Sequence, residues 1–134
     1  MQMPPQGAME PTMAERKDGA VIIVSSIAAL KGSTVLGLYG VSKAADTALV
    51  RNYACEWGPF NIRVNAILPG LINTDFARAL WENDKTRTAR EAITPLRRLG
   101  EPGEIGGIAV FLASAAAKFI TGQTIIADGG VTIA

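Results

Sequence analysis

The fold of this chain is set by residues 19–26, which read GAVIIVSS. Val21 to Val24 form an unbroken β-branched run, with Gly19 before it and two serines after it. Short apolar runs bounded by turn residues are typical of parallel strands that are buried on both faces. Open α/β sheets bind their ligands at the carboxyl ends of such strands. Ser26 is therefore predicted to lie at a ligand-binding edge of a sheet.

Strands and helices alternate along the rest of the chain. Strands are expected at 20–25, 64–68 and 123–127. Helices are expected at 38–57 and 103–113, after the last turns of a helix at 13–17. The region 75–90 is interpreted as mobile and charged with helical patches, and residues 1–10 as disordered. These elements predict an α/β fold in which about three parallel strands are flanked by helices.

Tyr39 and Lys43 are four positions apart, at the start of the helix expected over 38–57. Side chains at i and i+4 lie on the same face of a helix. An ammonium group beside a phenol favours the phenolate form, and general acid–base chemistry needs a group tuned in this way. The same spacing is also that of an ordinary pair on a helix surface. Ser26, thirteen positions before Tyr39, favours the catalytic interpretation.

Six segments resemble the short-chain dehydrogenase/reductase family in the right order, from about Pro11 to the end of the chain. They are Val24-Ser25-Ser26, Tyr39-x-x-x-Lys43, Asn61-Ile62-Arg63-Val64-Asn65, Pro69-Gly70 with Thr74, Arg98-Leu99-Gly100-Glu101-Pro102, and Thr121-Gly122-Gln123 through Asp128-Gly129-Gly130. The resemblance implies a Rossmann-like, doubly wound sheet. It also implies an oxidoreductase that uses NAD or NADP and acts on a small carbonyl or alcohol substrate.

The resemblance implies a role for each member of the trio. Tyr39 exchanges a proton with the substrate oxygen while hydride moves between the substrate carbon and the nicotinamide. Lys43 favours the reactive form of Tyr39 and holds the ribose hydroxyls of the cofactor. Ser26 donates a hydrogen bond to the same substrate oxygen, although a serine after a strand can also simply cap a turn.

Pro69, Gly70, Ile72 and Thr74 follow the second expected strand, where relatives pass along the nicotinamide. The resemblance implies that they bind the cofactor, with the backbone of Ile72 and the hydroxyl of Thr74 reaching the carboxamide. The residue types leave other roles open. A proline and a glycine make a turn without any ligand, and a threonine can cap the helix that follows it.

The glycine-rich turn that opens family members has no counterpart in these 134 residues. Members carry Gly-x-x-x-Gly-x-Gly between a strand and a helix, whose amino terminus binds the pyrophosphate. Residues 11–134 therefore resemble the carboxyl-terminal half of a classical member, and the choice between NAD and NADP cannot be read. Two interpretations remain: a truncated oxidoreductase, and a non-catalytic fragment that acts in assembly and cannot bind dinucleotide alone.

Composition argues against several other classes. The net charge is +1, so a nucleic-acid partner is not expected. The apolar runs are shorter than the roughly 20 residues of a membrane helix. Residues 1–13 lack the features of a secretory signal, so we expect a cytoplasmic location. With no histidine and one cysteine, a Ser-His-Asp triad, a typical zinc site and an internal disulfide are excluded.

Three further segments are interpreted from their residue types. Cys55 is expected to be a buried structural thiol and Asn65 to be structural. Asp128-Gly129-Gly130 is expected to form a terminal turn with positive φ. Phe76, Leu80 and Trp81, in the family's variable substrate-binding region, share a helix face that can either line a substrate pocket or pack on the core.

The strand at Val21–Val24 is expected to have an open edge. In the family, the three strands predicted here are the later strands of a larger sheet, so this strand would lose one neighbour. An unpaired apolar edge favours self-association or marginal stability. The long helix over 38–57 is the expected interface of a homo-oligomer.

Overall fold

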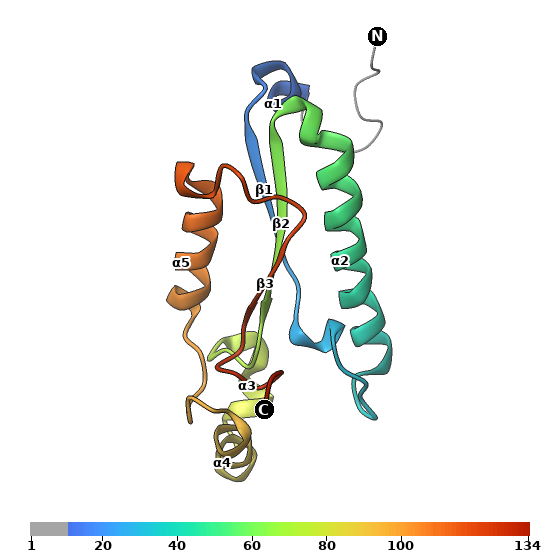
Figure 1. Cartoon of the computed structure of the whole chain (residues 1–134). Coiled ribbons are helices and arrows are strands. Elements are labelled where there is room, and N and C mark those ends of the chain that lie inside the picture. Colours follow the sequence, from blue (N-terminus) through green and yellow to red (C-terminus); the bar gives the residue numbers. More distant parts are fainter. Residues whose placement is uncertain (1–10) are drawn as a thin grey trace.

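The computed structural model describes residues 11–134 (Figure 1), so the disorder expected for residues 1–10 lies outside the described part. The strands are β1 (Gly19–Val24), β2 (Ile62–Pro69) and β3 (Thr124–Ala127). The helices are α1 (Pro11–Arg16), α2 (Gly37–Trp57), α3 (Arg78–Trp81), α4 (Asp84–Ile93) and α5 (Pro102–Ala113). Short 3-10 turns follow at Ile27–Ala29, Gly58–Phe60, Asp75–Ala77 and Ala115–Ala117. The α/β class and the alternation of elements are confirmed.

The sheet has three parallel strands in the order β1-β2-β3. Val21 pairs with Val64, and Ile67 pairs with Val24 on one side and Ile125 on the other. Because β2 has a partner on both edges, it is longer than the expected 64–68 and includes Pro69 at its carboxyl end. Nearly all of its side chains are buried, as a strand covered on both faces requires.

The two long helices cover opposite faces of the sheet (Figure 1). On one face, Val50, Ala54 and Trp57 of α2 pack against Val64 and Leu68 of β2, and this set forms the main core. On the other face, α5 lies over β1 and β2. The connection from β1 to β2 runs through α2, and the connection from β2 to β3 runs through α5. Both lead to the next strand in the same direction across the sheet. Because α2 and α5 lie on opposite faces, the two connections have opposite handedness. One of the two therefore departs from the right-handed rule of parallel connections.

The prediction that β1 is buried on both faces is wrong. Its side chains are only partly buried, and Val24 at its carboxyl end is 54% exposed. The reason is its position, because β1 is an edge strand and has a partner on one side only. A β-branched run indicates a strand, but the sequence alone does not show how many layers cover that strand.

The long helix predicted over 38–57 is confirmed, since α2 spans Gly37–Trp57 and ends before a turn that contains Pro59. Cys55 is exposed rather than buried, so that prediction is wrong. Ala54 and Trp57 face the core, and a step of one residue rotates the side chain by about 100° onto the solvent side. Within residues 11–134, no helix is long and apolar enough to cross a lipid bilayer.

The region after β2 contains the helical patches expected over 75–90. They are a 3-10 turn at Asp75–Ala77, then α3, then α4, which continues to Ile93. Asn83 caps α4 through a hydrogen bond in which its side-chain oxygen accepts from Thr86 N. The predicted mobility of this region stays a prediction.

Candidate active site

Tyr39 and Lys43 lie on one face in the first turns of α2. The Lys43 Nζ atom is 5.6 Å from the centre of the Tyr39 ring, as the four-residue spacing predicts. Tyr39 is 37% exposed, so its ring is open to an incoming molecule. A cation over the face of an aromatic ring is attracted to it. The pair is therefore assembled locally, by one turn of helix.

Lys43 has a second partner on the same helix. Its Nζ atom lies 3.4 Å from Asp46 Oδ2, and both side chains are mostly shielded from solvent. The backbone of Lys43 is also fixed, because Ser25 Oγ donates to Lys43 O at 3.0 Å. This bond ties the carboxyl end of β1 to the first turns of α2. The ammonium group is thus shared between the Tyr39 ring and a carboxylate.

Ser26 follows β1 directly and begins the 3-10 turn Ile27–Ala29. Its Oγ accepts a hydrogen bond from Ala28 N at 3.1 Å, so it does cap a turn. That bond uses the oxygen as an acceptor and leaves the hydroxyl proton available for donation. The turn packs closely on α2, since a Cβ at Gly40 would lie 3.1 Å from Ala28 O. The structure thus brings the Ser26 segment against the helix turn that begins at Tyr39.

Pro69 and Gly70 are held by the end of β3. Gly70 N donates to Ala127 O at 3.0 Å. A Cβ at Gly70 would lie 2.8 Å from Asp128 Cα, which is closer than real contacts allow. The glycine is therefore required by the packing of two backbones. This role exists whether or not a ligand binds there.

Ile72 is held by contacts with a distant part of the chain, and Thr74 by contacts with residues that closely follow it. Ile72 forms an isolated parallel bridge with Gly100, and Asn73 N donates to Gly100 O at 2.9 Å. Thr74 caps the next turn, where its side chain accepts from Ala77 N. The indole Nε1 of Trp81 donates to Thr74 O at 2.8 Å. The capping role expected for Thr74 is thus present, and Trp81 holds its carbonyl in place.

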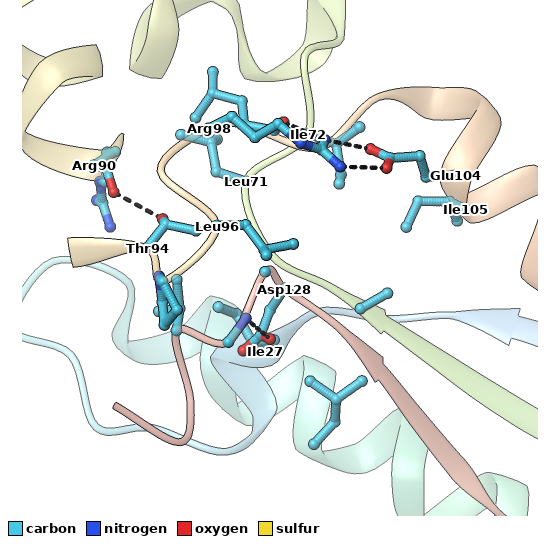
Figure 2. A pocket seen from close by; sticks show the side chains of 18 of the residues that line it. Ile27, Leu71, Ile72, Arg90, Thr94, Leu96, Arg98, Glu104, Ile105 and Asp128 are labelled. Carbon is cyan, nitrogen blue, oxygen red and sulfur yellow. Dashed lines mark hydrogen bonds and ion pairs between the residues drawn. The ribbon is translucent and has the colours of Figure 1, made fainter. Parts of the chain in front are cut away.

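Arg98 and Glu104 form a two-point ion pair beside Ile72 (Figure 2). The two guanidinium nitrogens of Arg98 lie 2.8 and 2.6 Å from the two carboxylate oxygens of Glu104. Glu104 also accepts from Glu101 N at 2.8 Å, which completes a capping box at the start of α5. The hydrogen bond from Arg98 is the main cause that lowers the pKa of Glu104 to about 2. The Arg98–Glu104 ion pair therefore ties the loop that contains Gly100, the partner of Ile72, to the start of α5.

A cavity of about 590 Å³ lies between this loop, the inner face of α5 and the turn after β3 (Figure 2). Its walls are mainly apolar, and Leu71, Leu99, Ile105 and Ile126 contribute to them. Of the predicted site residues, only Ile72 lines this cavity. The trio of Ser26, Tyr39 and Lys43 lies outside it, although Ile27, the neighbour of Ser26, is part of its wall.

Phe76 and Leu80 do not pack on the core, and the alternative, that these side chains and Trp81 line a substrate pocket, stays a prediction. Phe76 is 91% exposed and Leu80 is 42% exposed, so neither belongs to the core. None of the three lines the cavity. The 3-10 turn before α3 breaks the helical spacing on which the prediction depended, so these side chains do not share one buried face.

Asn65 is structural, as expected. It is almost fully buried on β2, where its amide nitrogen donates to Ile120 O and its oxygen accepts from Gln123 N, both at 3.0 Å. These two bonds fix the segment that leads into β3. A buried amide with both ends satisfied stabilises one register of the strand.

The turn after β3 also has the predicted form. Gly129 and Gly130 have φ values of 65° and 95°. The carboxylate of Asp128 accepts from Gly130 N at 2.9 Å and from Thr132 N at 2.8 Å. Partial burial acts to raise the pKa of Asp128, but these hydrogen bonds outweigh it and the pKa is lowered. The turn is thus stable with an ionised carboxylate.

Comparison with known proteins agrees with this geometry. The sequence profile of the family described as enoyl-(acyl carrier protein) reductase matches residues 6–132. Dehydrogenase/reductase SDR family member 4 from Bos taurus is 45% identical over 123 residues, which are 92% of this chain and 44% of that protein. A tropinone reductase homolog from Arabidopsis thaliana is 43% identical, over 86% of this chain and 38% of its own. The chain belongs to the short-chain dehydrogenase/reductase family.

Solved structures show that the family fold is shared. A gluconate 5-dehydrogenase from Burkholderia cenocepacia, in complex with NADP and tartrate, superposes with a TM-score of 0.88 at 32% identity. The match covers 92% of this chain and 48% of that one. The chain therefore spans about half the length of the short-chain dehydrogenases that it matches, and the match lies in their carboxyl-terminal portion.

Sequence reasoning missed the Arg98–Glu104 pair and the cavity of this short-chain dehydrogenase segment. The sequence did contain a signal for Glu104, because Glu101 and Glu104 have the spacing of a capping box around Pro102. The partner Arg98 lies before the helix and is not marked by any periodicity. The cavity has walls from α4, α5, β3 and several loops, so no single stretch of sequence indicates it.

Proposed function

We propose that this chain supplies the catalytic side of an NAD(P)-dependent oxidoreductase. The reaction is hydride transfer between a nicotinamide and a small carbonyl or alcohol substrate. The observation that carries the proposal is the position of Lys43 Nζ over the exposed ring of Tyr39, next to the segment that bears Ser26. A bound nicotinamide would supply the hydride donor or acceptor.

The trio has three distinct tasks in this proposal. Tyr39 exchanges its phenolic proton with the substrate oxygen, which its exposed ring can reach. Lys43 places its ammonium group over the Tyr39 ring and donates to the ribose hydroxyls of the cofactor. Ser26 donates its free hydroxyl proton to the substrate oxygen while its own oxygen stays bonded to Ala28 N.

The segment from Pro69 to Thr74 is proposed to bind the nicotinamide end of the cofactor. Pro69 and Gly70 lie where β2 ends, which is where open α/β sheets bind ligands. The backbone of Ile72 and the hydroxyl of Thr74 are assigned to the carboxamide. Support comes from the rigidity of this segment, since Gly100 and Trp81 fix it on both sides.

The residues present fit one end of a dinucleotide. The Burkholderia relative is described as a complex with NADP, and a reductase from Brucella melitensis as one with bound NAD. Lys43 offers a cation for ribose, and Thr74 offers a hydroxyl for the carboxamide. The 134 residues contain no Gly-x-x-x-Gly-x-Gly segment for the pyrophosphate. The proposal therefore assigns this chain the nicotinamide end and leaves NAD and NADP as alternatives.

The second candidate function is a non-catalytic fragment that acts in assembly. Two observations favour it. The ammonium group of Lys43 is paired with Asp46, which competes with the Tyr39 ring for it. The pyrophosphate-binding segment is absent from the sequence. Such a fragment would keep the fold and the interfaces of the family without binding dinucleotide.

Titration with NADH and NADPH, followed by nicotinamide fluorescence, separates the two candidates. Saturable binding in the micromolar range that Lys43→Met weakens supports the enzyme. The matched control is Lys85→Met, at an exposed lysine of α4 outside the proposed site. If the chain shows no binding at millimolar cofactor, catalysis by this chain alone is wrong.

We also propose that the chain forms a homo-oligomer through α2. Leu38 is 87% exposed, Val41 is 66% exposed and Leu49 is 38% exposed on this helix. Exposed aliphatic side chains gathered on one helix favour contact with another protein surface. A cytoplasmic location and a small carbonyl or alcohol substrate remain part of the same proposal.

A further inference from the structure

The cavity beside Ile72 has exposed apolar side chains on several of its walls. Ile93 of α4, Leu96 of the loop after it and Ile126 of β3 all line it, and they are 57%, 62% and 44% exposed. Its volume of about 590 Å³ lies within the roughly 300–1,000 Å³ of small-molecule sites. Apolar side chains that meet at one concave surface are typical of a ligand site. The cavity therefore suits an apolar molecule.

The wall formed by the end of α4 and the loop after it is held in place by the turn that follows β3. Leu96 N donates to Gly129 O at 3.2 Å, and a Cβ at Gly129 would lie 2.7 Å from Thr94 Cγ2. Thr94 is buried, and its hydroxyl donates to Arg90 O at 2.8 Å. The cavity is thus formed before any ligand binds, so a ligand does not have to order this wall.

The ionisable side chains on the cavity wall differ in whether they have partners. They are Arg90, Arg98, Glu104 and Asp128. Arg98 and Glu104 form their two-point ion pair, and Asp128 accepts from two backbone amides of its own turn. Arg90 is exposed and makes no ion pair with another side chain of residues 11–134. Figure 2 shows Arg90 and the Arg98–Glu104 pair at different sides of the cavity. The cation of this wall that lacks a carboxylate partner is therefore the guanidinium of Arg90.

One part of the cavity wall lies next to the proposed catalytic trio. Ile27, which directly follows Ser26, is part of this wall, and so is Val131 in the turn after β3. Lys31 Nζ donates to Val131 O at 3.2 Å, which joins the loop after Ser26 to that turn. A molecule whose reacting oxygen lies at Ser26 therefore has the apolar wall of the cavity beside it.

We propose that this cavity binds an apolar carboxylate, with the aliphatic or aromatic body of the molecule against the apolar wall and its carboxylate on Arg90. Arginine suits this task because its planar guanidinium donates two parallel hydrogen bonds to a carboxylate. The identity of the bound molecule as the substrate rests on the proposed function. On that basis the substrate is an oxo or hydroxy acid. Its carbonyl or hydroxyl oxygen lies at Ser26 and Tyr39, and its carboxylate lies at the far end of an apolar chain or ring.

The test is titration calorimetry of the full chain, without cofactor, with octanoate, 1-octanol and octylammonium as probes. Octanoate is expected to bind saturably and about tenfold or more tightly than 1-octanol, because charge-assisted hydrogen bonds add to the burial of the same alkyl chain. Octylammonium is expected to bind more weakly than 1-octanol, since its charge is repelled by Arg90. Hexanoate is expected to bind roughly tenfold more weakly than octanoate, because it buries two fewer methylenes.

A matched pair of arginine variants tests the carboxylate contact. Arg90→Met is expected to weaken octanoate binding about tenfold or more and to leave 1-octanol binding unchanged. The control is Arg87→Met, which removes the same charge about one turn earlier on α4, from a side chain that is paired with Glu91 and does not line the cavity. It is expected to change neither affinity. Arg87 and Arg90 are both exposed, so both variants keep the fold.

A second pair of variants tests the apolar wall. Leu96→Gln is expected to weaken the binding of octanoate and of 1-octanol alike, by roughly threefold or more, because a polar amide replaces apolar contact surface. The control is Ile133→Gln, since Ile133 is 89% exposed in the C-terminal turn and does not line the cavity. Its binding of both probes is expected to be unchanged.

The outcomes separate this inference from the proposed function. Octanoate binding that depends on Arg90, in a chain that binds no NADH, confirms the carboxylate site and removes its role as a substrate site. NADH binding without octanoate binding at millimolar concentration leaves the proposed function standing and overturns the inference. Equal affinity for octanoate and 1-octanol, or an equal loss in Arg90→Met and Arg87→Met, also overturns it.

Discussion

The two faces of the sheet differ in how completely they are covered. On the α2 face, Val50 and Trp57 are closed against a set of fully buried side chains of β2. On the α5 face, Leu112 is fully buried, but Val110 on the helix and Val24 at the end of β1 remain exposed. The α2 face of the sheet is therefore closed by side chains of this chain, whereas the α5 face keeps apolar side chains exposed to solvent.

The largest expected effect comes from a matched pair of leucines. Leu68 lies on β2 in the closed core and Leu112 lies on the inner side of α5, and neither has exposed surface. Leucine-to-alanine changes in cores cost roughly 2–5 kcal/mol, and less where the site can collapse. Leu68→Ala is expected near the upper end and Leu112→Ala near the lower end, as measured by urea unfolding. Equal losses would contradict the contrast between the two faces.

A smaller effect is expected at Arg63, which anchors α5. Its guanidinium donates to Leu112 O at 2.6 Å and to Ala113 O at 3.4 Å, so it satisfies carbonyls at the end of the helix. Hydrogen bonds from charged groups contribute roughly 1.5–3 kcal/mol. Arg63→Leu is expected to lower the free energy of unfolding by this amount. In Arg63→Leu, amide hydrogen exchange is also expected to become faster in α5 and to change less in α2.

The control for this variant is Arg51→Leu, at an exposed arginine of α2. It removes the same charge from the other face and is expected to leave the free energy of unfolding nearly unchanged. If both variants lose stability equally, the effect is one of net charge. The proposed anchoring of α5 by Arg63 would then be wrong.

The smallest expected effect is the pH dependence of the Arg98–Glu104 pair. The pKa of Glu104 is lowered from 4.5 to about 2, so the stabilisation is fully present above pH 4.5 and is lost as the pH falls toward 2. Both side chains are about half exposed, so the contribution is small. Glu104→Gln is expected to differ from the parent chain above pH 4.5 and to converge with it near pH 2.

The measurement is the urea midpoint as a function of pH. Glu56→Gln, at an exposed glutamate of α2, is the control and is expected to show no such convergence. A constant gap between Glu104→Gln and the parent chain across this range would show that the side chain acts by packing. The charge would then not be what holds the loop beside Ile72.

Much of the fold and part of the candidate site could be predicted from the sequence. The helix over Gly37–Trp57 and the position of β3 agree with their patterns within a residue or two. The Tyr39–Lys43 contact follows from one helical turn, and the turn at Gly129 follows from glycine's tolerance of positive φ. These features depend on residues that are close together in the sequence, and a sequence pattern contains information about such residues.

Other features were decided by the tertiary structure. The exposure of Cys55 and of β1 depends on which layers cover them, and the prediction of burial was wrong for both. The Arg98–Glu104 pair and the cavity join segments separated by loops, so no periodicity indicates them.

The order of strands and helices, the family and the Tyr39–Lys43 spacing could all be read from the sequence, because they follow from local periodicity and short motifs. That α2 closes one face of the sheet and that the outer side of α5 stays exposed could be seen only in the folded chain. Coverage depends on contacts between segments far apart in the chain.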